Sequence, residues 1–230
     1  MKRISTVIGQ CFLKRSRRRT LAISVLPNGA VEVVAPLTAG IPEIQAKIQK
    51  RSGWIMRQRR LFMALRVDRP VRRYCNGATH RYLGRQYRLK VSKVNSPGVK
   101  LRGAYLHISS PSLTSSAIAA LLAGWMRGRA KDQFERRLGK WRAWCVTRGL
   151  PDPTLHLLAM PKRWGSTHSD GRMYLNPELV RAPALCIDYV ITHEVCHLKH
   201  PRHDKGFYAE LERLCPKWRA LKQRLETSEL

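Results

Sequence analysis

Acidic residues are scarce in the first two-thirds of this 230-residue chain. Residues 1–150 contain 32 Lys and Arg but only five Asp and Glu, whereas residues 151–230 contain 12 and ten. This shortage argues against a carboxylate-rich magnesium site in the first part. The formal charge of +29 predicts a field that attracts polyanions and is screened by salt. The basic part is therefore either a solvated surface or a site of non-specific contact with DNA, RNA or another polyanion.

Several common signals are missing from the chain. No apolar run approaches the roughly 18–20 residues needed to cross a bilayer, and the basic N-terminus lacks the apolar centre of a secretory signal. The sequence has no GxxxxGK[ST] phosphate loop and no CxxC pair. Its six cysteines are scattered, which is typical of reduced and mostly buried thiols. We therefore expect a cytoplasmic protein with no membrane contact.

Hydrophobic periodicity predicts an α+β fold. Apolar residues alternate on both sides of Pro27-Asn28-Gly29, which predicts a hairpin over residues 20–36. Three short strands are expected within residues 79–109. A long helix, capped by Ser115 or Ser116, is expected to run to about Arg148.

Two further strands, at residues 155–160 and 171–176, are predicted on either side of a loop. We expect strand 171–176 to pair with an extended peptide by strand addition. The chain would then comprise a basic, strand-rich N-terminal lobe over residues 1–112 and a C-terminal lobe over residues 113–230.

Four of the eight histidines lie within ITHEVCHLKHPRH, residues 191–203. His193, Glu194 and His197 form an HExxH motif. On a helix, positions i and i+4 differ by about 40° in azimuth and about 6 Å in rise, so two imidazoles can bind one zinc ion. Glu194 follows the first histidine and cannot point straight at the metal. It is placed to hold the water bound to the metal and to accept its proton.

The third ligand depends on where this helix ends. In a continuous helix His200 would lie about 10.5 Å along the axis from His193, too far to share one tetrahedral ion. Pro201 disfavours helical geometry at His200 and should end the helix there. We therefore favour His203, the first histidine that can fold back to the metal. His200 is the less favoured choice, and Glu210 and Glu212 are further candidates.

Four segments resemble the YgjP-like metallopeptidase family and, more loosely, SprT-like and WLM proteases: RWGS (163–166), YLN (174–176), DYVITHEVCHLKHPRHDKGFY (188–208) and CPKW (215–218). The resemblance implies that His193, His197 and His203 bind zinc and that Glu194 is the catalytic base. It also implies that the C-terminal lobe, residues 113–230, is a zincin-like catalytic lobe. Two positions depart from the family pattern. Thr167 stands where the family usually has cysteine, and Arg202 where it usually has asparagine.

The expected function is a zinc metallopeptidase that holds one Zn²⁺ per chain and hydrolyses a peptide or protein substrate. One alternative is a metal-dependent hydrolase of nucleotides or other phosphate esters, with the basic part holding the phosphates. A second alternative is a nucleic-acid-binding module with structural zinc. Glu194 beside the first ligand argues against the second alternative, because a closed structural site needs no base.

Overall fold

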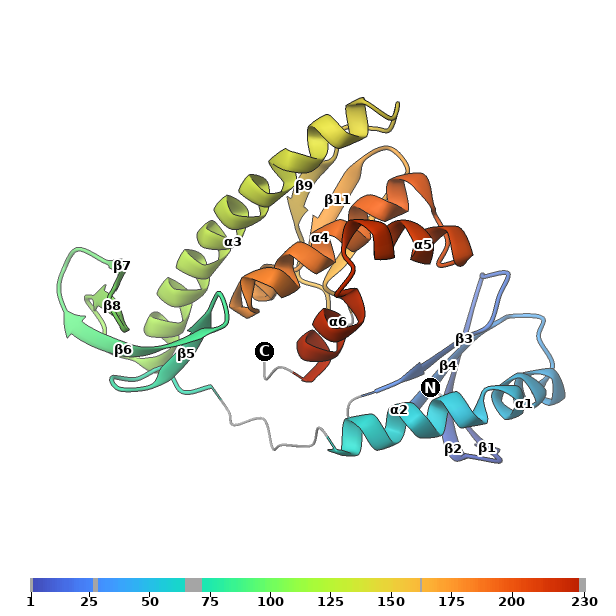
Figure 1. The fold of residues 1–230 in the computed structure, drawn as a ribbon. Helices are drawn as coiled ribbons and strands as arrows, with labels where there is room; N and C mark the ends of the chain where they lie inside the picture. The colour runs from blue at the N-terminus through green and yellow to red at the C-terminus, as the bar shows by residue number, and fades with distance from the viewer. Residues whose placement is uncertain (1, 27–28, 65–71, 162, 228–230) are drawn as a thin grey trace. The chain divides into compact units, whose positions relative to one another are not determined.

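The computed structural model describes residues 2–26, 29–64, 72–161 and 163–227, and it confirms the α+β class (Figure 1). The chain divides into two compact units, Met1–Pro70 and Val71–Leu230. This division comes earlier in the chain than the lobe boundary expected after residue 112. The reason is that the strands between residues 79 and 110 pack against the long helix that follows them, so they belong to the second unit.

The first unit combines a four-stranded sheet with two helices. The strands are β1 (Lys2–Thr6), β2 (Gly9–Ser16), β3 (Ala22–Val25) and β4 (Val31–Pro36), in the order β1-β2-β4-β3, and the helices are α1 (Ile41–Lys50) and α2 (Ser52–Ala64). Its core is formed by alternate strand residues such as Val31 and Val33 packed against Ile44, Ile48 and Ile55. The antiparallel pairing of β3 with β4 confirms the predicted hairpin, although residues 27–28 lie outside the described residues.

The second unit begins with another four-stranded sheet. Its strands are β5 (Thr79–Tyr82), β6 (Arg85–Lys93), β7 (Gly98–Arg102) and β8 (Tyr105–Ser110), in the order β5-β6-β8-β7. The expectation of three strands was therefore wrong by one. Gly103, with φ of 53°, allows a tight turn between β7 and β8 that the apolar pattern did not reveal.

Helix α3 (Ser115–Val146) links this sheet to the rest of the second unit (Figure 1). The long predicted helix is confirmed, but its N-cap is Thr114, whose Oγ1 accepts a hydrogen bond from the Ala117 amide at 3.4 Å. Its buried residues recur every three or four positions, which forms one apolar stripe: Ile118, Leu122, Met126, Ala130, Phe134, Leu138, Trp141 and Cys145.

A three-stranded sheet and the C-terminal helices complete the second unit. The strands are β9 (Thr154–Leu157), β10 (Gly165–Thr167) and β11 (Arg172–Leu175), in the order β10-β11-β9. A short 3-10 helix, η1 (Pro177–Arg181), leads to α4 (Ala184–Lys199), α5 (Lys205–Leu214) and α6 (Trp218–Thr227).

Two sequence expectations change at this sheet. Strands β9 and β11 confirm the two that were predicted, but the predicted loop between them contains β10. Strand β11 pairs with β10 on one side and with β9 on the other, so it has no open edge for a peptide. The expectation that strand 171–176 binds an extended peptide was therefore wrong, and β10 and β9 are the strands at the two edges of this sheet.

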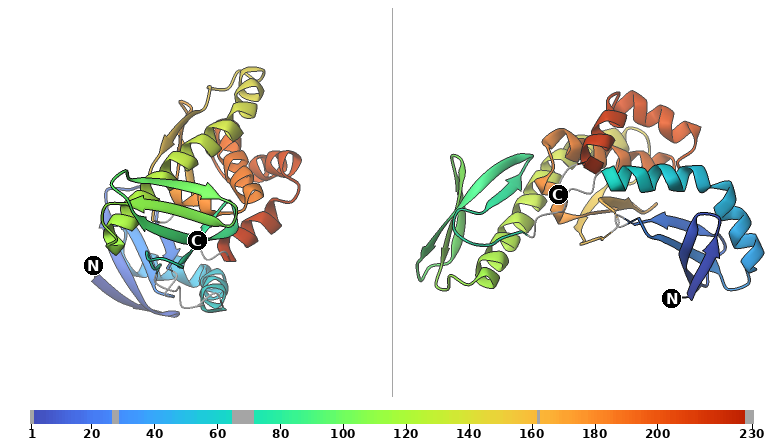
Figure 2. Two further views of the ribbon diagram at one scale, coloured as in Figure 1. Left: turned by 90° about the vertical axis from the view of Figure 1, so that its left-hand side faces the viewer. Right: turned by 90° about the horizontal axis from the view of Figure 1, so that it is seen from below.

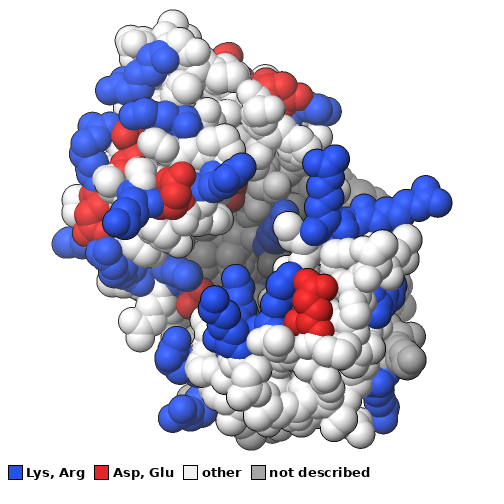
Figure 3. Space-filling model, turned by 90° about the vertical axis from the view of Figure 1, so that its right-hand side faces the viewer, with Lys and Arg blue, Asp and Glu red and all other residues white. Residues whose placement is uncertain are grey.

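The surface charge, the helices and the cysteines of the structure can be compared with what the composition predicts. Basic side chains are spread over the face drawn in Figure 3, where acidic side chains are fewer. No helix in the described ranges is long and apolar enough to cross a membrane. All six cysteines are free thiols, and four of them are buried.

Gly84 provides a test of the packing between the sheet of β5 to β8 and the start of α4. Its φ is +80°, and a Cβ there would lie 2.8 Å from the Cα of Pro183, at the start of α4. Gly84→Ala should therefore cost about 1–2 kcal/mol for the left-handed backbone and more for the collision with Pro183. Gly103→Ala is the matched control, because Gly103 also has positive φ but a Cβ there would have no neighbouring atom within 4 Å. Thermal unfolding should show a larger fall in Tm for Gly84→Ala, and equal falls would contradict this packing.

Candidate metal centre and active site

Helix α4 carries the HExxH residues through the middle of the second unit. Ile187, Ile191 and Val195 form its fully buried side. Asp188, one turn before the motif, makes an ion pair with Arg137 of α3 at 3.2 Å, and the Arg137 side chain is only 10% exposed. The helix is therefore held by apolar packing and by a half-buried ion pair, so its histidines have a defined position and direction.

The structure brings three histidines together at the C-terminal end of α4. His193 and His197 lie one turn apart on the helix, and His203 comes from the segment between α4 and α5. One ring nitrogen from each lies within 4.8 Å of the others. The Nε2 atoms of His193 and His203 are 3.0 Å apart.

The end of α4 explains how His203 reaches the other two. The helix stops at Lys199, and His200 has φ of −125° and ψ of 89°, as expected for a residue before proline. Asp204 then caps α5, where its Oδ1 accepts a hydrogen bond from the Phe207 amide at 2.9 Å. These two stops confine the connection to a few residues and direct His203 back over the helix end.

His200 contributes through its backbone and not through its ring. Its imidazole packs against Gly206, whose added Cβ would lie 3.1 Å from the His200 Cε1 atom. Its carbonyl oxygen accepts a hydrogen bond from Nδ1 of His197 at 3.1 Å. Since a carbonyl only accepts, this bond places the His197 proton on Nδ1 and leaves Nε2 free to bind a metal.

Phe207 forms a common base for the three imidazoles. Its ring centroid lies 4.9 Å from that of His193, 4.7 Å from that of His197 and 4.6 Å from that of His203. Phe207 is fully buried. Its contact with all three rings depends on the turn between α4 and α5, so no local pattern could have revealed it.

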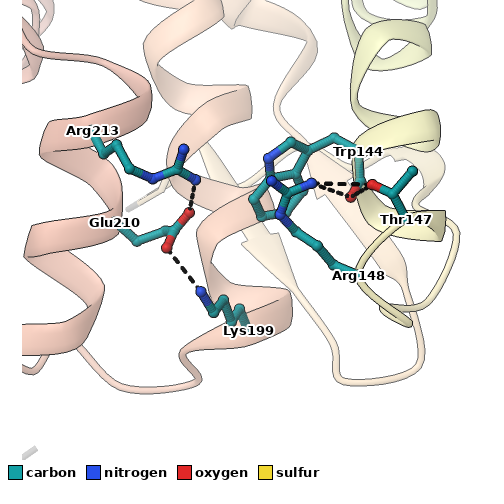
Figure 4. A network of polar contacts seen from close by, with 6 residues as sticks. All are labelled: Trp144, Thr147, Arg148, Lys199, Glu210 and Arg213. Atoms are coloured by element: carbon teal, nitrogen blue, oxygen red, sulfur yellow. Dashed lines mark hydrogen bonds and ion pairs between the residues drawn. The ribbon is translucent and has the colours of Figure 1, made fainter.

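The two glutamates considered as ligands are engaged elsewhere. Figure 4 shows Glu210 between Lys199, whose Nζ lies 2.9 Å away, and Arg213. Burial raises the pKa of Glu210, but the hydrogen bonds from Arg213 and Lys199 outweigh it and hold the pKa below its usual range. Glu212 accepts hydrogen bonds from Trp218 Nε1 and Arg219, each at 2.6 Å. Neither carboxylate belongs to the histidine cluster.

Glu194 is buried beside the cluster without being part of it. Its side chain faces β10, where Thr167 Oγ1 donates a hydrogen bond to Glu194 Oε2 at 2.9 Å. A Cβ at Gly165 would lie 2.6 Å from Glu194 Oε1, so only glycine leaves room for the carboxylate there. Burial raises the pKa of Glu194 to about 7, although the bond from Thr167 and the charge of Arg163 oppose that rise.

Thr167 and Gly165 are functional candidates that sequence reasoning did not assign. Both belong to a segment that was expected to be a loop, and Thr167 was noted only as a departure from a family pattern. The alternation of β10 points both positions towards α4. The signal available in the sequence was the RWGS segment itself, but its role required the position of β10 over the helix.

The histidines and Glu194 open into one cavity of about 580 Å³, which Trp164, Tyr189 and Lys222 also line. Burial, together with the nearby His197 and His203, lowers the pKa of His193 to about 3. Burial and His197 also lower the pKa of His203. Both imidazoles are therefore neutral at neutral pH, which is the form that binds metals.

The donor set fits a zinc ion. Two nitrogens that each lie about 2.0–2.1 Å from a tetrahedral ion are roughly 3.3 Å apart. The Nε2 atoms of His193 and His203 are 3.0 Å apart, close to this value, and no pair of ligand nitrogens in the cluster is separated by more than 4.8 Å. Three imidazoles with one position left open are a donor set used by catalytic zinc. Three nitrogen donors and no carboxylate in the cluster do not suit magnesium or calcium.

Comparison with known proteins decides the family. The YgjP-like metallopeptidase domain matches residues 19–228. The chain belongs to the YgjP-like metallopeptidase family. The resemblance carried by the RWGS and HExxH segments is thereby confirmed, and this YgjP-like chain is a metallopeptidase, which implies a metal ion and a peptide or protein substrate.

The other comparisons found less. No curated protein matches this YgjP-like chain. Among solved structures, the crystal structure of the metallopeptidase zymogen of Pyrococcus abyssi abylysin is similar over 45% of this chain and 90% of that chain, with 19% sequence identity and a TM-score of 0.31.

Metal analysis of single variants tests the proposed ligands. We expect about one zinc per chain in the parent protein, and a much lower content in His203→Ala, because two imidazoles alone hold zinc poorly. His200→Ala and Glu210→Gln should keep the parental content, since neither side chain faces the cluster. Full zinc in His203→Ala together with loss in His200→Ala would overturn the assignment. Circular dichroism of each variant distinguishes loss of metal from loss of fold.

Proposed function

We propose that this metallopeptidase binds one Zn²⁺ through His193, His197 and His203 and uses Glu194 as its general base. The observation that carries the proposal is the position of Glu194, a buried carboxylate that shares the cavity wall with the three histidines yet lies outside their cluster. Glu226 also lines the cavity, but it is exposed and lies 3.8 Å from the Lys222 ammonium. A buried carboxylate with a pKa near 7 can both accept and release a proton at neutral pH.

Zinc, when bound, supplies a Lewis acid that polarises a carbonyl group and makes water more acidic. The protein supplies the proton transfers. Glu194 accepts a proton from the water that attacks the scissile carbonyl carbon, and then delivers this proton to the departing amine. The bond from Thr167 fixes one carboxylate oxygen of Glu194, so the other oxygen has a defined position for these transfers.

Strand β10 supplies a way to orient the substrate. The Trp164 carbonyl accepts a hydrogen bond from the amide of Asn176, the residue after β11, and the His168 amide donates one to the Arg172 carbonyl of β11, at 2.9 Å each. By the alternation of an antiparallel ladder, the amide and carbonyl groups of Gly165 and Thr167 point to the other side, the open edge. An extended peptide paired there would run past Glu194 and the histidines. This assigns to β10 the role that the sequence had suggested for strand 171–176.

Family membership also separates this function from its alternatives. A phosphate-ester hydrolase would place most of its cations at the reacting centre, but of the described Lys and Arg residues only Arg163 and Lys222 line this cavity. A structural zinc site would be closed by a fourth protein ligand. In the described residues the cluster contains three histidines, and it faces a cavity.

Glu194→Gln tests the role of the base. We expect the variant to keep its zinc and its fold but to lose roughly 10²–10⁴-fold in turnover, the usual contribution of a general base. Cleavage of an unstructured protein such as casein, or of a quenched peptide library, gives the measurement.

Glu212→Gln is the matched control for this test. It makes the same chemical change at a carboxylate that bonds Trp218 and Arg219 and does not line the cavity. It should leave turnover near the parental value. Parental turnover in Glu194→Gln would remove Glu194 from the mechanism, whereas zinc loss in that variant would indicate a ligand and not a base.

A further inference from the structure

The sheet formed by β5 to β8 has one face covered by α3 and one face open. Leu89, Leu106 and Ile108 point towards α3 and are buried with Ile118 and Leu122. In the left view of Figure 2 this green sheet lies in front of α3, and the right view shows α3 along one side of it. Because strand side chains alternate, the neighbours of these buried residues form the opposite face.

The open face consists of two parallel rows of side chains. In the first row Tyr105 lies directly between Arg88 of β6 and Arg102 of β7. In the second row His107 lies directly between Lys90 of β6 and Lys100 of β7. Each row therefore places one aromatic ring on the central strand β8 and one cation on either side, about 4.8 Å away across the sheet. We call these six residues the open-face cluster.

The cations of the open-face cluster are not neutralised within the sheet. Residues 79–110 contain no Asp or Glu. Arg88, Lys90, Lys100 and Arg102 are exposed, and none of them makes an ion pair within the described part of the chain. Positive charge is therefore concentrated on a flat surface and available to an anionic partner.

The two rings of the open-face cluster are accessible from the same side as the cations. Tyr105 and His107 are half-buried, with ring centroids 6.2 Å apart. The Lys90 ammonium lies over the Tyr105 ring, 4.5 Å from its centroid. A planar group that stacks on Tyr105 would take the place of this ammonium and leave it free to bind an anion beside the ring.

We propose that the open-face cluster binds a single strand of nucleic acid. The bases would stack on Tyr105 and His107, and the phosphates would bind the four flanking cations. Four-stranded sheets with aromatic side chains on their central strands stack unpaired bases in this way. A duplex would fit less well, because its bases already stack on one another and offer no free face to the two rings. This binding site lies on a different sheet from the histidine cluster and does not depend on the peptidase function.

The composition of the face also decides against an anionic membrane. Stable binding to a membrane surface combines electrostatic attraction to anionic lipids with aliphatic or aromatic side chains that insert among the lipids. Apart from the open-face cluster, the outward residues of the two central strands are polar: Gln86, Ser92 and Ser109. Stacking platforms with flanking cations fit a polymer that carries both planar groups and phosphates.

The test is a fluorescence-anisotropy titration of the full-length, zinc-loaded protein with short labelled single strands of DNA and RNA at several salt concentrations. Four phosphate contacts predict a slope of log K against log salt of about −2.8, from about 0.7 per contact on single strands. Lys90→Gln/Lys100→Gln should make that slope shallower by about 1.4. Tyr105→Leu should weaken binding roughly 5- to 150-fold per lost stacking contact and leave the slope unchanged.

Lys131→Gln/Lys217→Gln is the control, because it removes the same two charges from exposed positions outside the sheet. It should leave the slope near the parental value. The proposal is overturned if both double variants make the slope shallower by the same amount, since binding would then reflect only net charge. It is also overturned if a duplex of equal length binds at least as tightly as the single strand, or if no single strand binds at about 0.15 M salt. Binding of anionic vesicles that depends on the open-face cluster, without binding of nucleic acid, would overturn it as well. Tm values of all variants show whether the sheet remains folded.

Discussion

The end of helix α4 is the constraint on which the rest of the candidate site depends. Because Pro201 cannot follow a helical His200 without a clash, the helix stops at Lys199 and the chain turns back. That turn gives the two helix histidines a third partner, His203, and brings Phe207 under all three rings. It also leaves the His200 carbonyl in place to hold the proton on Nδ1 of His197. A longer helix would provide none of these contacts.

The position of Glu194 depends on a second close approach, between α4 and the edge strand β10. Gly165 permits the approach because it has no side chain, and Thr167 completes it with a hydrogen bond to the carboxylate. Burial of this carboxylate raises its pKa, so the same contact that buries the group also prepares it for proton transfer. The free-energy cost of burying a charged carboxylate is therefore what brings the pKa of Glu194 to the range that its proposed role as a general base requires.

The second unit offers two sheets with different exposed parts. The sheet of β9 to β11 leaves an edge open at β10, where backbone groups can pair with a peptide. The sheet of β5 to β8 leaves a face open, where side chains can bind a partner. Helix α3 packs against both sheets, so the two surfaces are parts of one folded unit.

The sequence by itself determined the features that depend on local chemistry. The α+β class, the long helix to about Arg148, the HExxH helix and its stop before Pro201 follow from periodicity and from steric rules that act within a few residues. Tertiary structure alone decided the order of strands, which put β11 in the middle of its sheet and β10 at the edge. It also decided that Thr167 meets Glu194, that Glu210 turns away to Lys199 and Arg213, and that basic residues gather beside Tyr105 and His107. Most of these contacts join residues of different helices or strands, and the free energy that selects them comes from packing between elements, which no local pattern records.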